Sequence, residues 1–317
     1  MTKSNIGLIG LGTMGAMLAL NIAEKGFRIS VFNRTTATTR AFVKNAGELA
    51  DMITPCETLE ELIGTIEKPR AIILMVPAGP PVDEQIAALR PLLDDDDMII
   101  DAGNANFHDT NRRAAEAASA GILFLGIGVS GGEEGARHGP SIMGGGPEAS
   151  WHRVSYILTA ISAKYEKTPC ATWMGDGGAG HFVKTVHNGI EYADMQMIAE
   201  IYGVMRDGMG IGAAECGNIF SRWNNGPLQS YLTEISAKVS SAKDPKTGQP
   251  MLDVILDRAG QKGTGRWTAI EAQHLAAPIP VIEAAVTARN LSAQLDTRKN
   301  GENLFGPTPT ALSEGSL

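Results

Sequence analysis

The 317-residue sequence predicts an α/β protein in which a doubly wound, mostly parallel sheet precedes an all-helical region. Three observations predict this fold class. Short apolar runs alternate with helix-like stretches through the first half of the chain. A glycine-rich turn follows the first of those runs. The composition changes near residues 175–180, and the pattern beyond them is helical.

The strands are expected where short apolar runs are bounded by polar residues. These runs are Asn5–Leu11, Arg28–Phe32, Ala71–Val76, Met98–Asp101 and Ile122–Gly126. Between the first two runs, Met14 to Lys25 carries its apolar side chains on one stripe, which predicts a helix. The run Asp94 to Asp97 is expected to form a solvated turn before the fourth strand. The alternation predicts helices on both faces of the sheet.

The glycine-rich segment Gly175–Gly180 predicts a hinge between two domains, residues 1–178 and 179–305, with a tail at 306–317. One long helix is expected from about His181 to Met205, and helical pattern continues to about Leu304.

The remaining helical region shows two interruptions. Ile211 to Ser240 predicts two helices with a break near Trp223–Gly226. Lys243–Gly248 is expected to be a polar loop.

Composition and charge narrow the class of protein. A hydrophobic fraction of 43% and a charged fraction of 20% are ordinary for a soluble globular protein. No apolar run approaches 18 residues and no secretion signal precedes the first strand, which favours a cytoplasmic protein without membrane spans. The net charge of −8 argues against nucleic-acid or membrane-surface binding. Cys56, Cys170 and Cys216 form no CxxC pair, which indicates free thiols and no metal site.

The first turn has the pattern of a dinucleotide-binding loop. Gly10-Leu11-Gly12-Thr13-Met14-Gly15 follows a predicted strand and opens a predicted helix. Gly10 permits the tight turn, Gly12 lets backbone N–H groups approach a pyrophosphate, and Gly15 lets the helix pack close to the strand. The helix N-terminus then favours the phosphates. The pattern predicts a Rossmann-like cofactor domain.

The second strand ends in Asn33-Arg34-Thr35, where NAD-binding proteins usually have an acidic residue for the ribose 2′-hydroxyl. A carboxylate would repel a 2′-phosphate, whereas a guanidinium pairs with it. The segment therefore favours NADP over NAD. The alternative is that Arg34 is a surface residue and cofactor choice is lax.

Polar side chains share one stripe of the predicted long helix. At about 100° per residue, Lys184, His187, Asn188 and Glu191 fall on one side, and Val183, Val186 and Ile190 on the other, where they are expected to pack into a core. A lysine with a lowered pKa can take the proton of an alcohol during hydride transfer, and a glutamate can protonate an enol. The alternative is a solvent-facing stripe, against which Gly189 argues, because glycine costs a helix about 1 kcal/mol relative to alanine.

Four further places in the sequence carry candidate ligand contacts. Ser130-Gly131-Gly132-Glu133-Glu134-Gly135 and Asn104 follow predicted strands, at the sheet edge where α/β proteins bind ligands. Lys262-Gly263-Thr264-Gly265-Arg266 offers a small phosphate-sized nest, and Arg289 adds a cation. An acidic protein needs such local cations to bind an anionic substrate.

Taken in order, these motifs resemble the 6-phosphogluconate dehydrogenase family. The resemblance covers about residues 3–307 and includes the Gly10–Gly15 turn, Asn33–Thr35, Ser130–Gly135, Lys184–Tyr192, Lys262–Gly265 and Ala288-Arg289. It implies NADP-dependent oxidation and decarboxylation of 6-phosphogluconate to ribulose 5-phosphate in the pentose phosphate pathway, without a metal. It also implies a homodimer or homotetramer.

The resemblance assigns roles residue by residue. Lys184 becomes the general base and Glu191 the general acid. The implied contacts to the substrate carboxylate and hydroxyls are Asn104, Ser130, Gly131, Gly132, His187 and Asn188. The implied phosphate contacts are Tyr192, Lys262, Thr264 and Arg289. The implied cofactor contacts are Gly10, Leu11, Gly12, Thr13, Met14, Gly15, Asn33, Arg34, Thr35, Val76 and Asn104.

Two departures from the family pattern bear on activity. Long-type members continue with a second helical part whose Arg and His enter the neighbouring subunit's site. This sequence ends soon after Leu304–Pro307, although Ser130–Gly135 is typical of the long type. Pro77 stands where relatives usually have a lysine near the cofactor. The early end leaves open a truncated, NADP-binding form without catalysis. A second alternative is a β-hydroxyacid dehydrogenase, which resembles this sequence in fold and uses a similar lysine but would have no need for Lys262, Thr264 and Arg289.

Overall fold

The structure, a computed structural model, describes residues 2–306. The chain divides into two compact units, Met1–Thr185 and Val186–Leu317. Helix α8 (Ala179–Gly203) begins at the boundary predicted from the sequence and runs from the first unit into the second. The predicted tail, apart from Gly306, lies outside the described residues.

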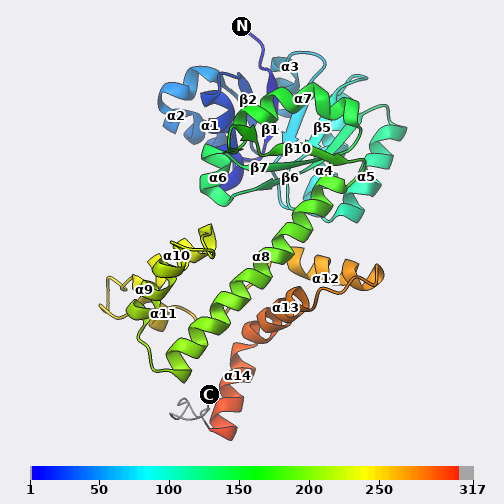
Figure 1. Cartoon of the computed structure of the whole chain (residues 1–317). Helices are drawn as coiled ribbons and strands as arrows, with labels where there is room; N and C mark the ends of the chain where they lie inside the picture. The colour runs from blue at the N-terminus through cyan, green and yellow to red at the C-terminus, as the bar shows by residue number, and fades with distance from the viewer. Residues whose placement is uncertain (1, 307–317) are drawn as a thin grey trace. The chain divides into compact units, whose positions relative to one another are not determined.

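The first unit is built on an eight-stranded sheet with strand order β10-β7-β6-β5-β4-β1-β2-β3 (Figure 1). Its strands are β1 (Ile6–Ile9), β2 (Ile29–Phe32), β3 (Ile53–Cys56), β4 (Ala71–Leu74), β5 (Met98–Asp101), β6 (Leu123–Ser130), β7 (Ser141–Gly145) and β10 (Ala171–Gly175). A separate two-stranded ribbon pairs β8 (Lys164–Tyr165) with β9 (Thr168–Pro169). All neighbours in the large sheet are parallel except β6 and β7. The order reverses between β1 and β4, which is the switch point of a doubly wound sheet, so the predicted fold class is confirmed.

The five predicted strands are all present, whereas β3, β7 and β10 were not predicted. β3 contains Pro55, and Pro is usually confined to sheet edges, where β3 lies. β7 ends in Gly144-Gly145, and strand propensity is low for glycine. Short strands of this composition have too few apolar residues for a pattern to reveal them.

Helices cover both faces of the sheet and define two cores. The helices of this unit are α1 (Thr13–Glu24), α2 (Thr36–Asn45), α3 (Leu59–Thr65), α4 (Pro80–Leu89), α5 (Phe107–Ser119), α6 (Gly132–His138) and α7 (Glu148–Ile161). Ile73 and Ile100 point to the core that includes α1 and α7. Ile72 and Ile99 point to the core that includes α3, α4 and α5. Successive strand residues face opposite sides, so a strand buried on both faces must be continuously apolar.

The expectation of a solvated turn at Asp94–Asp97 was wrong for its last residue. Asp97 is 1% exposed, and its carboxylate accepts a 2.6 Å bond from Nη1 of Arg70. Arg70 is itself buried, so turning the aspartate outward would remove the buried carboxylate that pairs with this guanidinium. Asp94 supplies the same guanidinium with a second carboxylate from the exposed side.

Beyond α8, the elements that the structure describes up to Gly306 are all helices. They are the π-helical turn Val204–Gly208, α9 (Ala213–Trp223), α10 (Tyr231–Ser241), α11 (Met251–Val254), α12 (Thr264–His274), α13 (Pro280–Ala293) and α14 (Leu295–Phe305). The predicted break near Trp223–Gly226 separates α9 from α10. Among the described residues, no helix is both long and apolar enough to cross a bilayer.

The expected apolar side of α8 does not pack into a core. Ile190 is 51% exposed, and Val183 and Val186 are only partly buried. The buried residues of this stretch lie elsewhere on the helix: Gly189 fits against Thr268 of α12, and Tyr192 packs with α13. Periodicity shows that a helix has two faces, but the neighbouring elements decide which one is covered.

Candidate functional site

The glycine loop between β1 and α1 has one closed side and one open side. A Cβ atom at Gly10 would collide with the carbonyl oxygen of Met75, and Gly10 has a φ of +102°. A Cβ at Gly15 would collide with the carbonyl oxygen of Gly10. A Cβ at Gly12 would meet nothing within 4 Å, so the space above the N-terminus of α1 is open. Gly12 occupies the N-cap position of α1 and has no side chain to bond the first N–H groups, and the first turn contains no acidic residue. The loop thus leaves backbone N–H groups facing an open space suited to phosphates.

The end of β2 is tied to this loop. Leu11 N donates a 3.1 Å hydrogen bond to Asn33 Oδ1, and Asn33 N donates to Thr39 Oγ1. Asn33 therefore fixes the loop while Arg34 and Thr35, next along the chain, are exposed. Val76, beyond β4, would lie 3.2 Å from a Cβ at Gly10. The structure brings the predicted cofactor residues from β1, β2 and β4 to one edge of the sheet.

Lys184 is buried, with 6% of the residue exposed. Its Nζ donates a 2.5 Å hydrogen bond to the carbonyl oxygen of Val129, next to Ser130 at the end of β6. Its stem lies against Gly128, where a Cβ would be 2.5 Å from the Cβ of Lys184. The amine is thereby placed beside the predicted substrate segment at Ser130.

The segment after β6 differs from the loop expected at Ser130–Gly135. Ser130 is the last residue of β6, and α6 begins at Gly132, leaving Gly131 as the joint. Gly131 and Gly132 have φ values of +131° and +63°, which residues with a side chain rarely adopt. Both glycines are exposed, as is Asn104 beyond β5.

In the second unit, the polar residues of α8 contact each other and α12. His187 Nδ1 lies 3.8 Å from Glu191 Oε2 and 3.1 Å from Asn188 Oδ1. Asn188 Nδ2 donates a 3.3 Å hydrogen bond to Thr264 Oγ1. Glu191 keeps 44% of its side chain exposed, so its carboxylate stays accessible.

The predicted phosphate residues gather around the start of α12. Gly263, with a φ of +106°, precedes Thr264, the first residue of the helix. Lys262 is exposed beside it, so a cation and a helix N-terminus lie together.

Arg289 stacks on Tyr192 in the same unit. The guanidinium carbon lies 3.9 Å from the ring centroid, and Nη1 donates a 2.6 Å bond to the carbonyl oxygen of Gly260. A Cβ at Gly265 would collide with the Tyr192 ring, so that glycine permits the close packing. Arg289 is thus held by stacking and hydrogen bonding, with part of its surface accessible.

The sequence reasoning missed His181, at the start of α8, and three buried polar residues that act on it: Thr110, Asp101 and Arg113. His181 is 1% exposed and its Nδ1 lies 2.8 Å from Thr110 Oγ1. Asp101 and Arg113 are 0% and 1% exposed, with 3.7 Å between Oδ2 and Nη1. The available signal was the position of His181, one helical turn before Lys184. The burial of His181, which distinguishes it from a surface histidine, cannot be deduced from one sequence.

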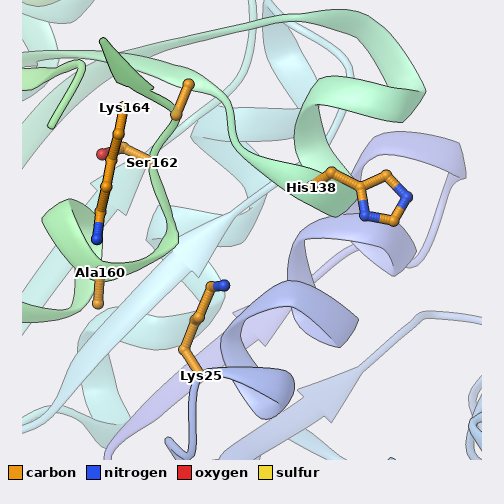
Figure 2. Close-up of a pocket in the computed structure, with 6 residues that line it drawn as sticks. Lys25, His138, Ala160, Ser162 and Lys164 are labelled. Carbon is orange, nitrogen blue, oxygen red and sulfur yellow. The ribbon is translucent and has the colours of Figure 1, made fainter. Parts of the chain in front are cut away.

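A separate open pocket of about 500 Å³ is lined by Lys25, His138, Ala160, Ser162, Ala163 and Lys164 (Figure 2). It contains none of the predicted site residues. Lys25 and His138 lie at the C-terminal ends of α1 and α6. Within residues 2–306, no group of three or more His, Cys, Asp or Glu side chains could hold a metal ion.

Comparison with known proteins covers both units. Residues 5–175 match the family model described as the NAD binding domain of 6-phosphogluconate dehydrogenase. Residues 180–316 match that of the 6-phosphogluconate dehydrogenase C-terminal domain.

Individual relatives extend the match along the chain. The decarboxylating 6-phosphogluconate dehydrogenase of Chlamydia pneumoniae is 48% identical over 307 residues, which is 97% of this chain and 64% of that protein. The NADP(+)-dependent, decarboxylating enzyme of Bacillus subtilis is 48% identical over 315 residues, covering 99% and 67%. The solved Plasmodium falciparum 6-phosphogluconate dehydrogenase superposes with a TM-score of 0.93 at 42% identity, covering 98% and 67%. The chain spans about two thirds of the length of these relatives.

The matches extend through the sheet unit and the helical unit, at identities far above those of a shared fold alone. On this ground the chain belongs to the 6-phosphogluconate dehydrogenase family.

Proposed function

We propose that this protein oxidises and decarboxylates 6-phospho-D-gluconate with NADP, giving D-ribulose 5-phosphate, CO2 and NADPH. One observation carries the proposal. Lys184 holds a buried amine at the end of β6, on the same helix that carries Glu191 with an accessible carboxylate. A base and an acid are what an oxidation followed by protonation of carbon needs.

The cofactor proposal rests on the glycine loop. The open space at Gly12 and the uncapped N-terminus of α1 fit a pyrophosphate, and the exposed Arg34 fits a 2′-phosphate. The Bacillus subtilis relative is NADP(+)-dependent, and the Plasmodium falciparum relative takes NADP+ as its cofactor. NADP, when bound, would accept the hydride from C3 of the substrate.

The residues of the chain would move two protons. Lys184 Nζ, as the neutral amine, takes the proton of the C3 hydroxyl while the hydride leaves. The resulting carbonyl is β to the carboxylate, so it accepts the electrons of the breaking C1–C2 bond as CO2 departs, and no metal is required. Glu191 then donates a proton to C2 of the resulting enolate, and this carbon becomes C1 of the product, while Lys184 retains the proton taken from the hydroxyl. Asn104, Ser130, Gly131, Gly132, His187 and Asn188 would hold the carboxylate and hydroxyls.

The phosphate end of the substrate is proposed to bind at the start of α12. Lys262 and Arg289 supply positive charge, and Thr264 supplies a hydroxyl at the helix N-terminus. Tyr192 supports Arg289 by stacking. The Plasmodium falciparum relative takes 6-phosphogluconate as its substrate.

Self-association and location complete the proposal. Ile190, Met197 and Val204 on α8 and its continuation are 48–51% exposed, which favours a homo-oligomer in which a second copy covers this apolar stripe. A monomer in light scattering at micromolar concentration would contradict this proposed self-association.

The proposed location is the cytoplasm. The three cysteines are free thiols in the structure, which is typical of cytoplasmic proteins. In this proposal residues 1–178 form the NADP-binding domain and residues 179–305 the substrate and dimerisation domain.

The decisive experiment follows NADPH absorbance after the 317-residue chain is mixed with NADP and 6-phosphogluconate, with NAD in parallel. Turnover with NADP, together with release of CO2, is the expected result. If NADP binds but no NADPH forms, the chain is a cofactor-binding protein without this activity. A Lys184→Ala variant serves as the control, because it should bind NADP and lack hydride transfer.

A further inference from the structure

His181 is a buried titratable group to which the proposed mechanism gives no role. It occupies the first turn of α8, three residues before Lys184, and is 1% exposed. Side chains three residues apart on a helix lie on the same side. A change in how the His181 side chain packs is therefore expected to shift the turn of α8 that carries Lys184.

The imidazole is bonded to α5. His181 Nδ1 lies 2.8 Å from Oγ1 of Thr110, a residue with 0% exposure. Thr110 Oγ1 also donates to the carbonyl oxygen of Asn106, 3.2 Å away and one turn back in its own helix. The Thr110 hydroxyl therefore lies between the imidazole and this carbonyl oxygen, and its contact with Nδ1 fixes the orientation of the ring.

The same two side chains lie against alternate glycines of β6. A Cβ at Gly126 would be 2.9 Å from His181 Nδ1, and a Cβ at Gly128 would be 2.5 Å from the Cβ of Lys184. Residues two apart on a strand point to the same face. Gly126 and Gly128 have no side chains on this face of β6, and His181 and Lys184 therefore pack against it side by side. His181 attaches α8 to the strand, and Lys184 carries the functional amine.

Fixed charges surround the ring. Asp101, Arg113 and Lys184 act on it, and Asp101 and Arg113 already face each other at 3.7 Å. Within the described part of the chain, Asp101 Oδ2, Arg113 Nη1 and His181 Nε2 have no hydrogen-bond partner. Burial lowers the pKa of His181, so the ring is held neutral. A neutral ring adds no positive charge next to a lysine that must lose its proton.

We propose that His181 is a positioning residue for the lysine base: held by Thr110 and seated on Gly126, it fixes the first turn of α8 on β6 and so places the Lys184 side chain. This inference rests on the proposed function, since it assumes that Lys184 is the base. It predicts that loss of the anchor affects the chemical step and leaves binding of both substrates intact.

The test compares four variants of the full chain. His181→Leu removes the bond to Thr110, and Thr110→Val removes it from the other side with little change of shape. His181→Asn places an amide near the position of Nδ1 and should restore much of the function. Leu158→Ala removes a fully buried side chain from α7 and controls for destabilisation alone.

We expect His181→Leu and Thr110→Val to lower kcat by roughly 10- to 100-fold, with both KM values little changed, because small misplacements of a reacting group have effects of this size. Leu158→Ala should keep kcat at temperatures where it is folded. Unchanged kcat in both His181→Leu and Thr110→Val would overturn the inference.

A second readout needs no turnover. Acetylation of Lys184 by acetic anhydride, followed by peptide mass spectrometry, reports how firmly the amine is held. Labelling should be several-fold faster in His181→Leu and Thr110→Val than in the wild type and in Leu158→Ala. Equal labelling rates in all of them would refute a positioning role. If the wild type shows no turnover, the proposed function fails, while the labelling rates still decide the role of His181.

Discussion

The Lys184 side chain occupies the space that a side chain at Gly128 would need. A Cβ atom at Gly128 would lie 2.5 Å from the Cβ of Lys184 and 3.1 Å from its Cδ. The carbonyl oxygen of Gly180 closes the same space at 3.1 Å. The position of the buried amine therefore depends on the absence of a single methyl group on β6.

Gly128→Ala should displace α8 from the sheet. We expect a loss of stability of about 1–3 kcal/mol from overpacking and at least about a 100-fold loss of kcat from the displaced lysine. Urea unfolding and NADPH formation measure the two effects. The matched control is Gly64→Ala in α3, where a Cβ meets nothing within 4 Å. It should be neutral or slightly stabilising. Full activity in Gly128→Ala would show that the contact does not position Lys184.

Glu191→Gln should remove the proposed proton donor and keep the shape of the side chain. Because general acids typically contribute 10²- to 10⁴-fold, we expect kcat to fall by about that range while NADP binding is retained. The control is Glu200→Gln, an exposed residue of the same helix that accepts a hydrogen bond from Gln196. Steady-state kinetics and NADP titration distinguish the two. Wild-type turnover in Glu191→Gln would assign the acid to another group.

Arg34→Asp should shift preference from NADP towards NAD. The new carboxylate repels a 2′-phosphate and can accept a hydrogen bond from a ribose 2′-hydroxyl. We therefore expect kcat/KM with NADP, divided by kcat/KM with NAD, to fall by at least about tenfold. Lys44→Asp, an equal charge change at an exposed residue of α2, should leave the ratio near that of the wild type. An unchanged ratio in Arg34→Asp would exclude Arg34 from cofactor choice.

Much of the sheet unit could be predicted because its strands are buried on both faces. Ile72, Ile73 and Leu74 are continuously apolar for that reason, and such a run is visible in one sequence. The dinucleotide loop was also predictable, since the spacing of its glycines between a strand and a helix is a local pattern; a Cβ would collide with backbone at Gly10 and Gly15, and Gly12 leaves open space.

Tertiary burial could not be predicted in the same way. Ile190 has the pattern of a core residue and is exposed, whereas Asp97 lies in a run of acidic residues and is buried beside Arg70. His181 differs from a surface histidine only in what surrounds it. Arg70 and Thr110, the partners of Asp97 and His181, lie far away from them in the sequence, so no local pattern contains these contacts.

Arg289→Lys should weaken binding of the substrate phosphate. The guanidinium stacks on Tyr192 while donating to Gly260, and a lysine ammonium cannot hold both contacts. We expect KM for 6-phosphogluconate to rise about tenfold, equivalent to about 1.4 kcal/mol, with kcat changed less. Arg222→Lys, at an exposed residue of α9, should leave KM unchanged. An unchanged KM in Arg289→Lys would place the phosphate elsewhere.

The stability of the protein should contain a pH-dependent contribution from His181. Burial lowers its pKa in the folded state, whereas in the unfolded chain the pKa is about 6.5. Below that pH the unfolded state binds a proton that the folded state does not. The stabilising contribution is therefore complete above about pH 6.5 and is lost as the pH falls below it, by at most about 1.4 kcal/mol per pH unit.

Urea unfolding of the wild type and of His181→Asn at pH 7.5, 6.0 and 5.0 measures this contribution directly. At pH 7.5 the variant should be less stable, because a smaller side chain fills the buried site. As the pH falls, the gap between the two proteins should narrow, since asparagine takes up no proton in either state. Nearby Asp101, Arg113 and Lys184 are common to both proteins, so their titration largely cancels in the difference. A gap that stays constant across this range would mean that His181 binds its proton equally in the folded and unfolded states, and the buried neutral ring would have to be abandoned.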